Sequence, residues 1–123
     1  MSVTILGLRT TIYRVNDIDK AKQWYAAAFG VQPYFDEPFY VGFNIGGYEL
    51  GLQPEEGAII RGENVITYWG VEDIHAVYEA FLAVGATTHE APTNVGGELV
   101  VATVKDPWEN LIGLIYNPEF REG

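Results

Sequence analysis

The side chains in this chain that could do chemistry are few, and four of them fall on predicted strands. Glu49 and Gln53 lie four residues apart in one predicted strand, so they share a face of it. Arg14 and Tyr68 lie in two further strands. A carboxylate that is shielded from water can have a raised pKa and act as a general base. Glu49 is therefore the candidate catalytic residue, with Tyr68 as its candidate partner.

Other reactive side chains are scarce. The chain has no cysteine, which excludes a zinc ribbon, an iron–sulfur cluster, a thiol nucleophile and a disulfide framework. It has two histidines, His75 in the first turn of a predicted helix and His89 in a short strand beside Glu90. A site formed by His89 and Glu98 is an alternative, but ordinary surface histidines are the preferred interpretation.

Composition and charge narrow the class of partner. The 123 residues are 48% hydrophobic, which is enough for one packed domain without disulfides or a structural metal. The formal net charge of −10 repels a phosphate backbone and weakly attracts cations. No stretch approaches the roughly 18 apolar residues of a membrane helix, and the first residues lack the pattern of a signal peptide. We expect a cytoplasmic protein that binds neither nucleic acid nor membrane.

Two stretches repeat one pattern, a strand followed by an amphipathic helix. They begin at Thr10 and at Ile66, and each reaches an aspartate or asparagine suited to cap a helix. In each helix apolar residues recur at spacings of three, four and three, which places them on one face. These residues are Ile18, Ala21, Tyr25 and Ala28 in the first helix and Ile74, Val77, Phe81 and Val84 in the second. Each helix ends near a glycine, Gly30 or Gly85.

Three short strands are predicted after each helix. They cover residues 33–36, 39–45 and 48–53 in the first half and residues 86–91, 98–104 and 111–116 in the second. Gly46 and Gly47 predict a tight hairpin, and residues 106–110 predict the matching turn. The chain is therefore predicted to be an α+β protein, a single domain of residues 1–123. It contains two βαβββ modules, about residues 5–54 and 65–118, and a linker of about residues 55–64.

Three local patterns resemble those of the vicinal-oxygen-chelate superfamily, of the glyoxalase, bleomycin-resistance and dioxygenase type. They are Tyr13 to Ile18 with Ala21, Trp24, Tyr25, Phe29 and Gly30; Val71 to Ile74 with Phe81 and Gly85; and Val104 to Leu114. The third resembles the family's Asp-Pro-x-Gly-Asn turn, with Glu109 in place of the usual glycine. The resemblance covers nearly the whole chain. It implies the glyoxalase/bleomycin-resistance/dioxygenase fold, with mixed curved sheets around a cleft, and a homodimer.

In the metal-dependent members of this family, His, Gln or Glu side chains on the first and last strand of each half hold a divalent ion. Counting from the matching motifs places these positions at Thr10, Gly51, Ile66 and Gly113. Isoleucine and glycine offer no side-chain donor, and a threonine hydroxyl is a weak one. Glu49 or Gln53 becomes a ligand if the alignment is displaced by two residues, but one donor lacks partners. We therefore expect no family metal site and no cofactor.

Alternation along the strands assigns the residues that face the cleft implied by the resemblance. The expected ligand-binding residues are Thr10, Ile12, Arg14, Glu49, Gly51, Gln53, Ile66, Tyr68, Leu111 and Gly113. This lining is mostly apolar, its two glycines leave extra room, and Phe39, Tyr40 and Trp108 are expected at the rim. Arg14 resembles an arginine that binds an anionic substrate group in some relatives, and a salt bridge to Glu49 is the alternative.

Three functions follow from these observations. The preferred one is a metal-free binding protein, similar to the bleomycin-resistance group, that holds a small aromatic or cationic organic molecule. A second is a glyoxalase-like lyase, an isomerase or a dioxygenase that uses a metal. A third is metal-free acid–base catalysis by Glu49.

Overall fold

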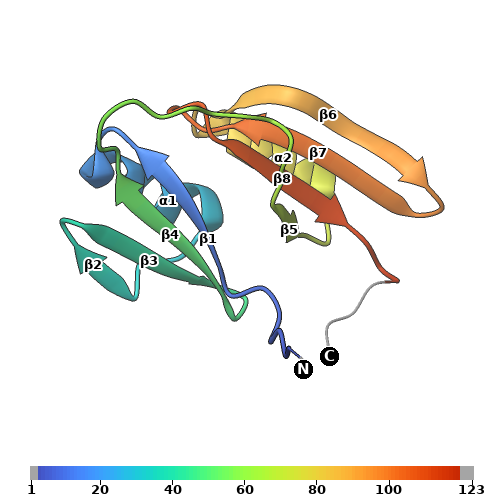
Figure 1. Ribbon diagram of the computed structural model, residues 1–123. Coiled ribbons are helices and arrows are strands. Elements are labelled where there is room, and N and C mark those ends of the chain that lie inside the picture. The colour runs from blue at the N-terminus through green and yellow to red at the C-terminus, as the bar shows by residue number, and fades with distance from the viewer. Residues whose placement is uncertain (1–2, 120–123) are drawn as a thin grey trace. The chain divides into compact units, whose positions relative to one another are not determined.

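The computed structural model describes residues 3–119, which form two sheets, each with a helix packed on one face (Figure 1). The chain divides into two compact units between Gly57 and Ala58, inside the predicted linker. The first unit contains β1 (Thr10–Val15), α1 (Ile18–Phe29), β2 (Phe35–Glu37), β3 (Tyr40–Ile45) and β4 (Tyr48–Pro54). The second contains β5 (Tyr68–Gly70), α2 (Ile74–Ala83), β6 (Thr87–Gly96), β7 (Leu99–Lys105) and β8 (Leu111–Tyr116).

The predicted α+β class and the order βαβββ in each half are both confirmed. Within the described residues, the strand order is β1-β4-β3-β2 in one sheet and β5-β8-β7-β6 in the other. The first strand of each unit runs parallel to the last, and the other neighbours are antiparallel. In residues 3–119, neither α1 nor α2 has the length and apolar character needed to cross a bilayer.

Alternation along the strands builds the core of the first unit. Tyr13 and Val15 of β1 and Leu50 and Leu52 of β4 are buried. The residues on the opposite face of β1 are exposed. Tyr25 of α1 is fully buried, and its ring stacks on that of Tyr13 at a centroid distance of 5.6 Å. The helix therefore covers one face of the sheet and leaves the opposite face open.

The ends of α1 follow the predicted capping pattern. The side chain of Asp17 accepts a hydrogen bond from the backbone N–H of Lys20 at 3.1 Å. Gly30 adopts a left-handed conformation with φ 70°, and its N–H donates to the carbonyl of Ala26. A side chain at residue 30 would be strained in this conformation, which explains the glycine.

The core of the second unit differs from the predicted apolar face of its helix, because Val77 and Val84 are only half-buried. Ile74 and Phe81 of α2 are buried as expected, but Tyr78 is buried where Val77 was predicted. The hydroxyl of Tyr78 lies 2.6 Å from the Thr88 hydroxyl on β6, so this buried side chain keeps a polar partner. The tyrosine ring is larger than valine and spans the gap between helix and sheet, which helical spacing alone does not reveal.

Two strands of the second unit also differ from their predicted limits. β5 contains only Tyr68–Gly70, so Ile66 lies before the strand and not in it. β6 continues to Gly96, past Pro92, and it lies at the edge of its sheet. A proline is tolerated at an edge, where its missing N–H needs no partner.

The turn between β7 and β8 is organised around one buried carboxylate. Asp106 is 2% exposed, and its Oδ1 accepts the backbone N–H groups of Trp108 and Asn110 at 2.8 Å each. Its Oδ2 accepts the side-chain amide of Asn110 at 2.9 Å. Glu109 has φ 69°, and it is the one residue other than glycine in the described chain with a positive φ. The turn therefore imposes a left-handed conformation at the position where the family pattern has glycine.

We expect Glu109→Gly to stabilise the protein by about 0.5–1 kcal/mol. A left-handed conformation costs roughly 1–2 kcal/mol for a residue with a Cβ, whereas the extra freedom of glycine in the unfolded chain costs about 0.5–1 kcal/mol. Urea denaturation followed by circular dichroism measures the difference. Glu119→Gly, outside any strand or helix, serves as the comparison, and equal stability of wild type and Glu109→Gly would show that the turn is not strained.

Candidate functional site

The open face of the first sheet, opposite α1, carries the six site residues predicted from that half of the chain. β1 contributes Thr10, Ile12 and Arg14, and β4 contributes Glu49, Gly51 and Gln53. The parallel pairing aligns them one by one, Thr10 with Glu49, Ile12 with Gly51 and Arg14 with Gln53. The three β1 residues are exposed, and the three β4 residues are half-buried or buried. The structure thus brings this group together on one surface.

Glu49 is a carboxylate on this face with several hydrogen-bond donors around it. One of its oxygens accepts the hydroxyl of Tyr34, and the other accepts the hydroxyl of Tyr40 at 2.8 Å. Burial raises the pKa of Glu49, but hydrogen bonds from Tyr34, Thr10 and Tyr40 together outweigh burial and hold the pKa below its ordinary value. The expectation of a raised pKa is therefore wrong. At neutral pH the group is an anion and a weak base.

The two tyrosines are tuned in the opposite direction. The hydrogen bond to Glu49 raises the pKa of Tyr34, and burial together with the same carboxylate raises that of Tyr40. Both phenols therefore keep their protons over the physiological range. Since each phenol has a single O–H, both protons are committed to Glu49.

Two glycines allow the tyrosines to reach Glu49. A Cβ on Gly51 would lie 2.1 Å from the hydroxyl oxygen of Tyr40, and a Cβ on Gly42 would lie 3.0 Å from Cε1 of Tyr34. Gly42 and Gly51 pair directly on β3 and β4. The expected extra room above Gly51 is therefore absent, because Tyr40 fills it. A glycine inside a strand often marks such a close approach.

The positions that the family resemblance assigns to metal ligands do not fit a divalent ion. Tyr40 covers Gly51, where a ligand side chain would have to lie. At Gly113 a Cβ would lie 2.6 Å from Cδ1 of Tyr68 and 2.9 Å from Cγ2 of Ile66, so this position is also covered by side chains. In residues 3–119, no three histidine, aspartate or glutamate residues are grouped so that they could hold an ion.

A hollow of about 270 Å³ opens beside the far ends of β1 and β4. It is lined by Arg14, Phe39, Gln53, Pro54 and Glu56. Arg14 and Gln53 are predicted site residues and Phe39 a predicted rim residue, whereas Glu56 falls in the predicted linker. With two charged side chains, the hollow is more polar than the apolar cleft expected from the sequence.

The strand register separates Arg14 from Glu49. Arg14 aligns with Gln53, while Glu49 aligns with Thr10, four residues along β1. At ~3.3 Å per residue this places their Cα atoms roughly 13 Å apart. The carboxylate is bound by tyrosine hydroxyls instead, so an Arg14–Glu49 salt bridge does not describe this face. The open face has two distinct polar regions, one around Glu49 and one around Arg14.

Tyr34 is a site residue that was not predicted from the sequence. It lies just before β2, and its backbone N–H donates to the carbonyl of Gly42 at 2.9 Å. This bond places the ring over β3, and its hydroxyl reaches Glu49. The available signal was Gly42, a glycine in a strand otherwise rich in aromatic and β-branched residues.

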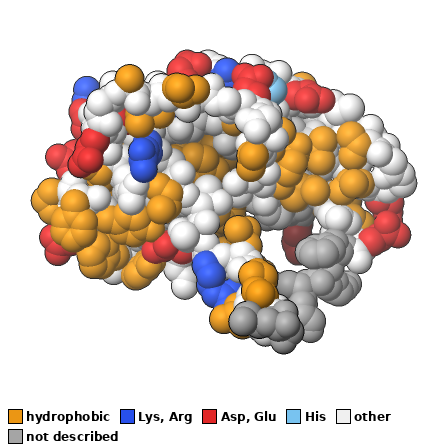
Figure 2. All heavy atoms as spheres, viewed as in Figure 1, with side chains coloured by type: hydrophobic (Ala, Val, Ile, Leu, Met, Phe, Trp, Pro, Cys, Tyr) orange, Lys and Arg blue, Asp and Glu red, His pale blue; other side chains and the backbone are white. Residues whose placement is uncertain are grey.

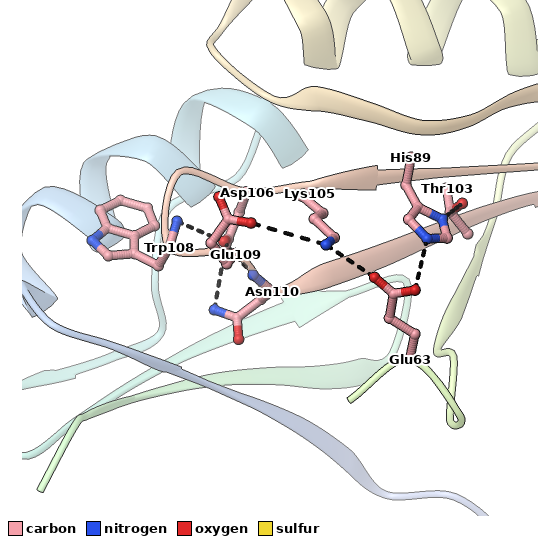
Figure 3. A network of polar contacts seen from close by, with 8 residues as sticks. All are labelled: Glu63, His89, Thr103, Lys105, Asp106, Trp108, Glu109 and Asn110. Atoms are coloured by element: carbon pink, nitrogen blue, oxygen red, sulfur yellow. Dashed lines mark hydrogen bonds and ion pairs between the residues drawn. The ribbon is translucent and has the colours of Figure 1, made fainter. Parts of the chain in front are cut away.

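The second unit has a separate polar network on its own open face (Figure 3). His89 on β6 lies between Glu63, with Nε2 3.1 Å from Oε1, and Thr103 on β7, with Nδ1 2.8 Å from Oγ1. Lys105 Nζ lies 3.0 Å from the second oxygen of Glu63. Hydrogen bonds from Lys105 and His89 lower the pKa of Glu63, and Glu63 raises that of Lys105. His89 thus contacts Glu63, not Glu98.

This order of carboxylate, imidazole and hydroxyl has the connectivity of a nucleophilic triad. Thr103, however, is 2% exposed, so a substrate cannot reach its hydroxyl. We therefore interpret the network as a structural one that fastens the segment around Glu63 to β6 and β7.

Of the other predicted site residues, Tyr68 pairs with Gly113 on this sheet, and Leu111 pairs with Lys105.

Two βαβββ units, each with its first and last strands paired in parallel, define a glyoxalase-like class of fold. The profile of the Glyoxalase/Bleomycin resistance protein/Dioxygenase superfamily matches residues 7–114. The chain belongs to this superfamily, as the sequence patterns predicted. No curated protein matches it in sequence.

Solved structures agree on the fold. A glyoxalase-related enzyme from Fulvimarina pelagi is similar with a TM-score of 0.79 and 16% identity over 97% of this chain and 94% of the other. A glyoxalase/bleomycin resistance protein/dioxygenase family enzyme from Burkholderia phytofirmans PsJN has a TM-score of 0.76 and 19% identity, covering 87% and 95%. The fosfomycin resistance protein FosX from Mesorhizobium loti has a TM-score of 0.73 and 16% identity, covering 94% and 96%.

Proposed function

We propose that this protein binds a small aromatic or cationic organic molecule on the open face of its first sheet, without the metal that many family members use. One observation carries the proposal. Glu49 is held as an anion by Tyr34 and Tyr40, among exposed aromatic side chains and on the same face as a hollow lined by Arg14 and Gln53. A few fixed polar groups amid apolar surface are typical of sites for small organic molecules.

The dimensions and the family support this proposal. A hollow of about 270 Å³ lies just below the roughly 300–1,000 Å³ that is usual for ligand sites, so a small molecule suits it. The similar structures include proteins named for resistance to an antibiotic, fosfomycin, and that function in those proteins involves a small organic molecule. The fold alone does not transfer their ligand to this chain.

An enzymatic function is the second candidate. Membership of a superfamily that includes glyoxalases and dioxygenases favours a lyase, an isomerase or a dioxygenase. Glu49 could serve only as a weak base, because its tyrosine partners lower its pKa. The donor-poor residues at the family's ligand positions likewise favour binding over metal-assisted chemistry.

We further propose that the chain functions in the cytoplasm as a homodimer, with residues 1–123 forming a single domain of two modules. Support comes from the family resemblance and from the absence of cysteine. Light scattering after size-exclusion chromatography tests the dimer. A mass of 13.7 kDa at micromolar concentration, that of one chain, would contradict it.

A thermal-shift screen tests the binding proposal. We expect some aromatic or cationic compounds to raise Tm, because a ligand that binds only the folded state stabilises it. Glu49→Gln should reduce the shift. Glu79→Gln, an exposed residue on α2 of the other unit, should leave the shift unchanged. Metal analysis of protein purified without chelator accompanies the screen, and a stoichiometric transition metal, or no stabilising compound at all, would overturn the proposal.

A further inference from the structure

Four aromatic rings gather around the β2–β3 hairpin of the first sheet. Tyr34 is 64% exposed, Phe35 39% and Phe39 65%, and Tyr40 is half-buried. The ring centroid of Phe35 lies 6.1 Å from those of both Phe39 and Tyr40, at interplanar angles of 67° and 56°. Figure 2 shows hydrophobic side chains covering this hairpin, at the left of the view. We call these four residues the aromatic cluster.

The glycines below Tyr34 and Tyr40 allow both rings to lie against the sheet, which leaves the outer faces of the rings accessible. Tyr34 lies over Gly42 and Tyr40 over Gly51, so each ring rests against the sheet. The large exposed fraction of Tyr34 shows that its outer side faces solvent. The face of an aromatic ring carries partial negative charge and attracts cations within about 6 Å of its centroid. A phenol that donates its proton to a carboxylate is polarised toward greater electron density in the ring.

A full negative charge lies beside two rings of the cluster, because Glu49 contacts the hydroxyls of Tyr34 and Tyr40. Glu49 accepts hydrogen bonds from Tyr34, Tyr40 and Thr10, and a carboxylate has about four acceptor positions in all, so it can still contact a cation. The nearby cation Lys22 is 3.0 Å from Asp36, and Glu37 adds another acidic group on β2. Arg14 lies roughly 13 Å along the strand from Glu49. Glu49 is therefore a local anion beside the rings of the aromatic cluster.

The same hydrogen bonds disfavour an anionic ligand. The protons of Tyr34 and Tyr40 are both donated to Glu49, so neither phenol has a proton left for a ligand carboxylate or phosphate. The negative charge of Glu49 would repel such a group as well. A neutral molecule would gain ring contacts but no charge interaction.

We propose that Glu49 and the aromatic cluster bind the substituted ammonium group of an organic cation. This inference rests on the proposed function and names the class of its ligand. The ammonium group lies against the outer faces of Tyr34 and Tyr40 with Glu49 as its counter-ion, and Phe35 and Phe39 contact its alkyl substituents. Aromatic cages that bind quaternary ammonium ions use such π faces.

Two compounds of nearly equal shape test the role of charge. Choline has a trimethylammonium group, and 3,3-dimethylbutan-1-ol has a neutral tert-butyl group in the same place. We expect NMR titration of the full chain to show choline binding at least ten-fold more tightly, with shifted resonances for Tyr34, Tyr40 and Glu49. Added salt should weaken choline binding and leave the neutral compound unaffected.

Variants separate charge from fold. Glu49→Gln keeps the size of the side chain and removes its charge, so it should weaken choline binding at least ten-fold and leave dimethylbutanol binding unchanged. Phe39→Leu should weaken choline binding several-fold, because a π face is lost at an exposed position. Glu79→Gln on α2 should behave as wild type. Preserved amide spectra establish that each variant is folded.

The two proposals fail in different ways. Equal affinity for choline and dimethylbutanol, or equal choline affinity in wild type and Glu49→Gln, overturns the cation inference and leaves ligand binding on this face intact. If neither compound shifts resonances of the aromatic cluster and no compound in the thermal-shift screen binds either, both proposals fail together.

Discussion

Replacing Asp106 with alanine is expected to lower the free energy of unfolding by about 3 kcal/mol. The carboxylate is 2% exposed and accepts three hydrogen bonds, from the N–H groups of Trp108 and Asn110 and from the Asn110 amide. Hydrogen bonds to a charged group contribute about 1.5–3 kcal/mol each, but water will reach some of the released donors because Pro107 and Glu109 are exposed. Urea denaturation followed by tryptophan fluorescence measures the loss.

Asp106→Asn provides the matched comparison. Its carbonyl oxygen can still accept both backbone N–H groups, whereas its amide would face the Asn110 amide as one donor against another. We expect about half the loss caused by alanine. If both variants are as stable as wild type, the turn is held by its backbone bonds, such as that from the Asp106 N–H to the Asn110 carbonyl, and the role given to the carboxylate is wrong.

This turn shows how far local sequence carries a prediction. Asp106, Pro107 and Asn110 are recognisable as turn residues, and the structure uses the aspartate as a cap for the backbone. The helix caps at Asp17 and Asp73 were predictable for the same reason. In each case the interacting groups lie within four residues of one another, so the chain has little freedom to place them elsewhere.

The faces of the strands were also predictable, because side chains alternate along any strand. Thr10, Ile12 and Arg14 lie on the open face as expected, and Tyr13 and Val15 lie in the core. The limits of β6 were not predictable. Its pairing with β7, which contains register shifts, extends the strand beyond its own strand-forming residues. Strand length depends on the neighbour as well as on the strand itself.

The environment of Glu49 could not be predicted from the sequence. Its partners Tyr34 and Tyr40 lie 15 and 9 residues away, and both bonds depend on how β2, β3 and β4 pair. An isolated carboxylate in an apolar cleft has a raised pKa, whereas the same group with hydroxyl donors has a lowered one. Burial alone therefore gave the wrong sign. His89 and Glu63, 26 residues apart, met in the structure for the same kind of long-range reason.

Gly51→Val is expected to disrupt the proposed binding site and to lower the free energy of unfolding by about 2 kcal/mol. The new Cβ would lie 2.1 Å from the Tyr40 hydroxyl oxygen and 2.6 Å from Cζ, so the ring must turn away and lose its hydrogen bond to Glu49. Overpacking of this kind costs about 1–3 kcal/mol, and the preference of valine for strands returns part of it. Urea denaturation measures the stability, and NMR titration follows the carboxyl group.

The direction of the Glu49 pKa makes this prediction specific. Because the Tyr40 hydroxyl is one of the donors that lower the pKa, losing it should raise the pKa of Glu49 toward its ordinary value. In the wild type, the favourable contribution of Glu49 is present above the pKa of the unfolded chain and is lost as pH falls through the lower folded-state pKa. During acid titration, the stabilising contribution of Glu49 should therefore be lost at a higher pH in Gly51→Val than in the wild type.

Gly70→Val is the control for this substitution. Gly70 lies in β5, has no atom within 4 Å of an added Cβ and has no positive φ, so the change should alter stability by less than about 0.5 kcal/mol. The double variant Gly51→Val with Tyr40→Ala removes the clash, so its loss should be smaller than the sum of the two single losses. Additive losses would mean that residue 51 and the ring do not compete for the same space. In that case Gly51 is not what allows Tyr40 to reach Glu49, and the glycine needs another explanation.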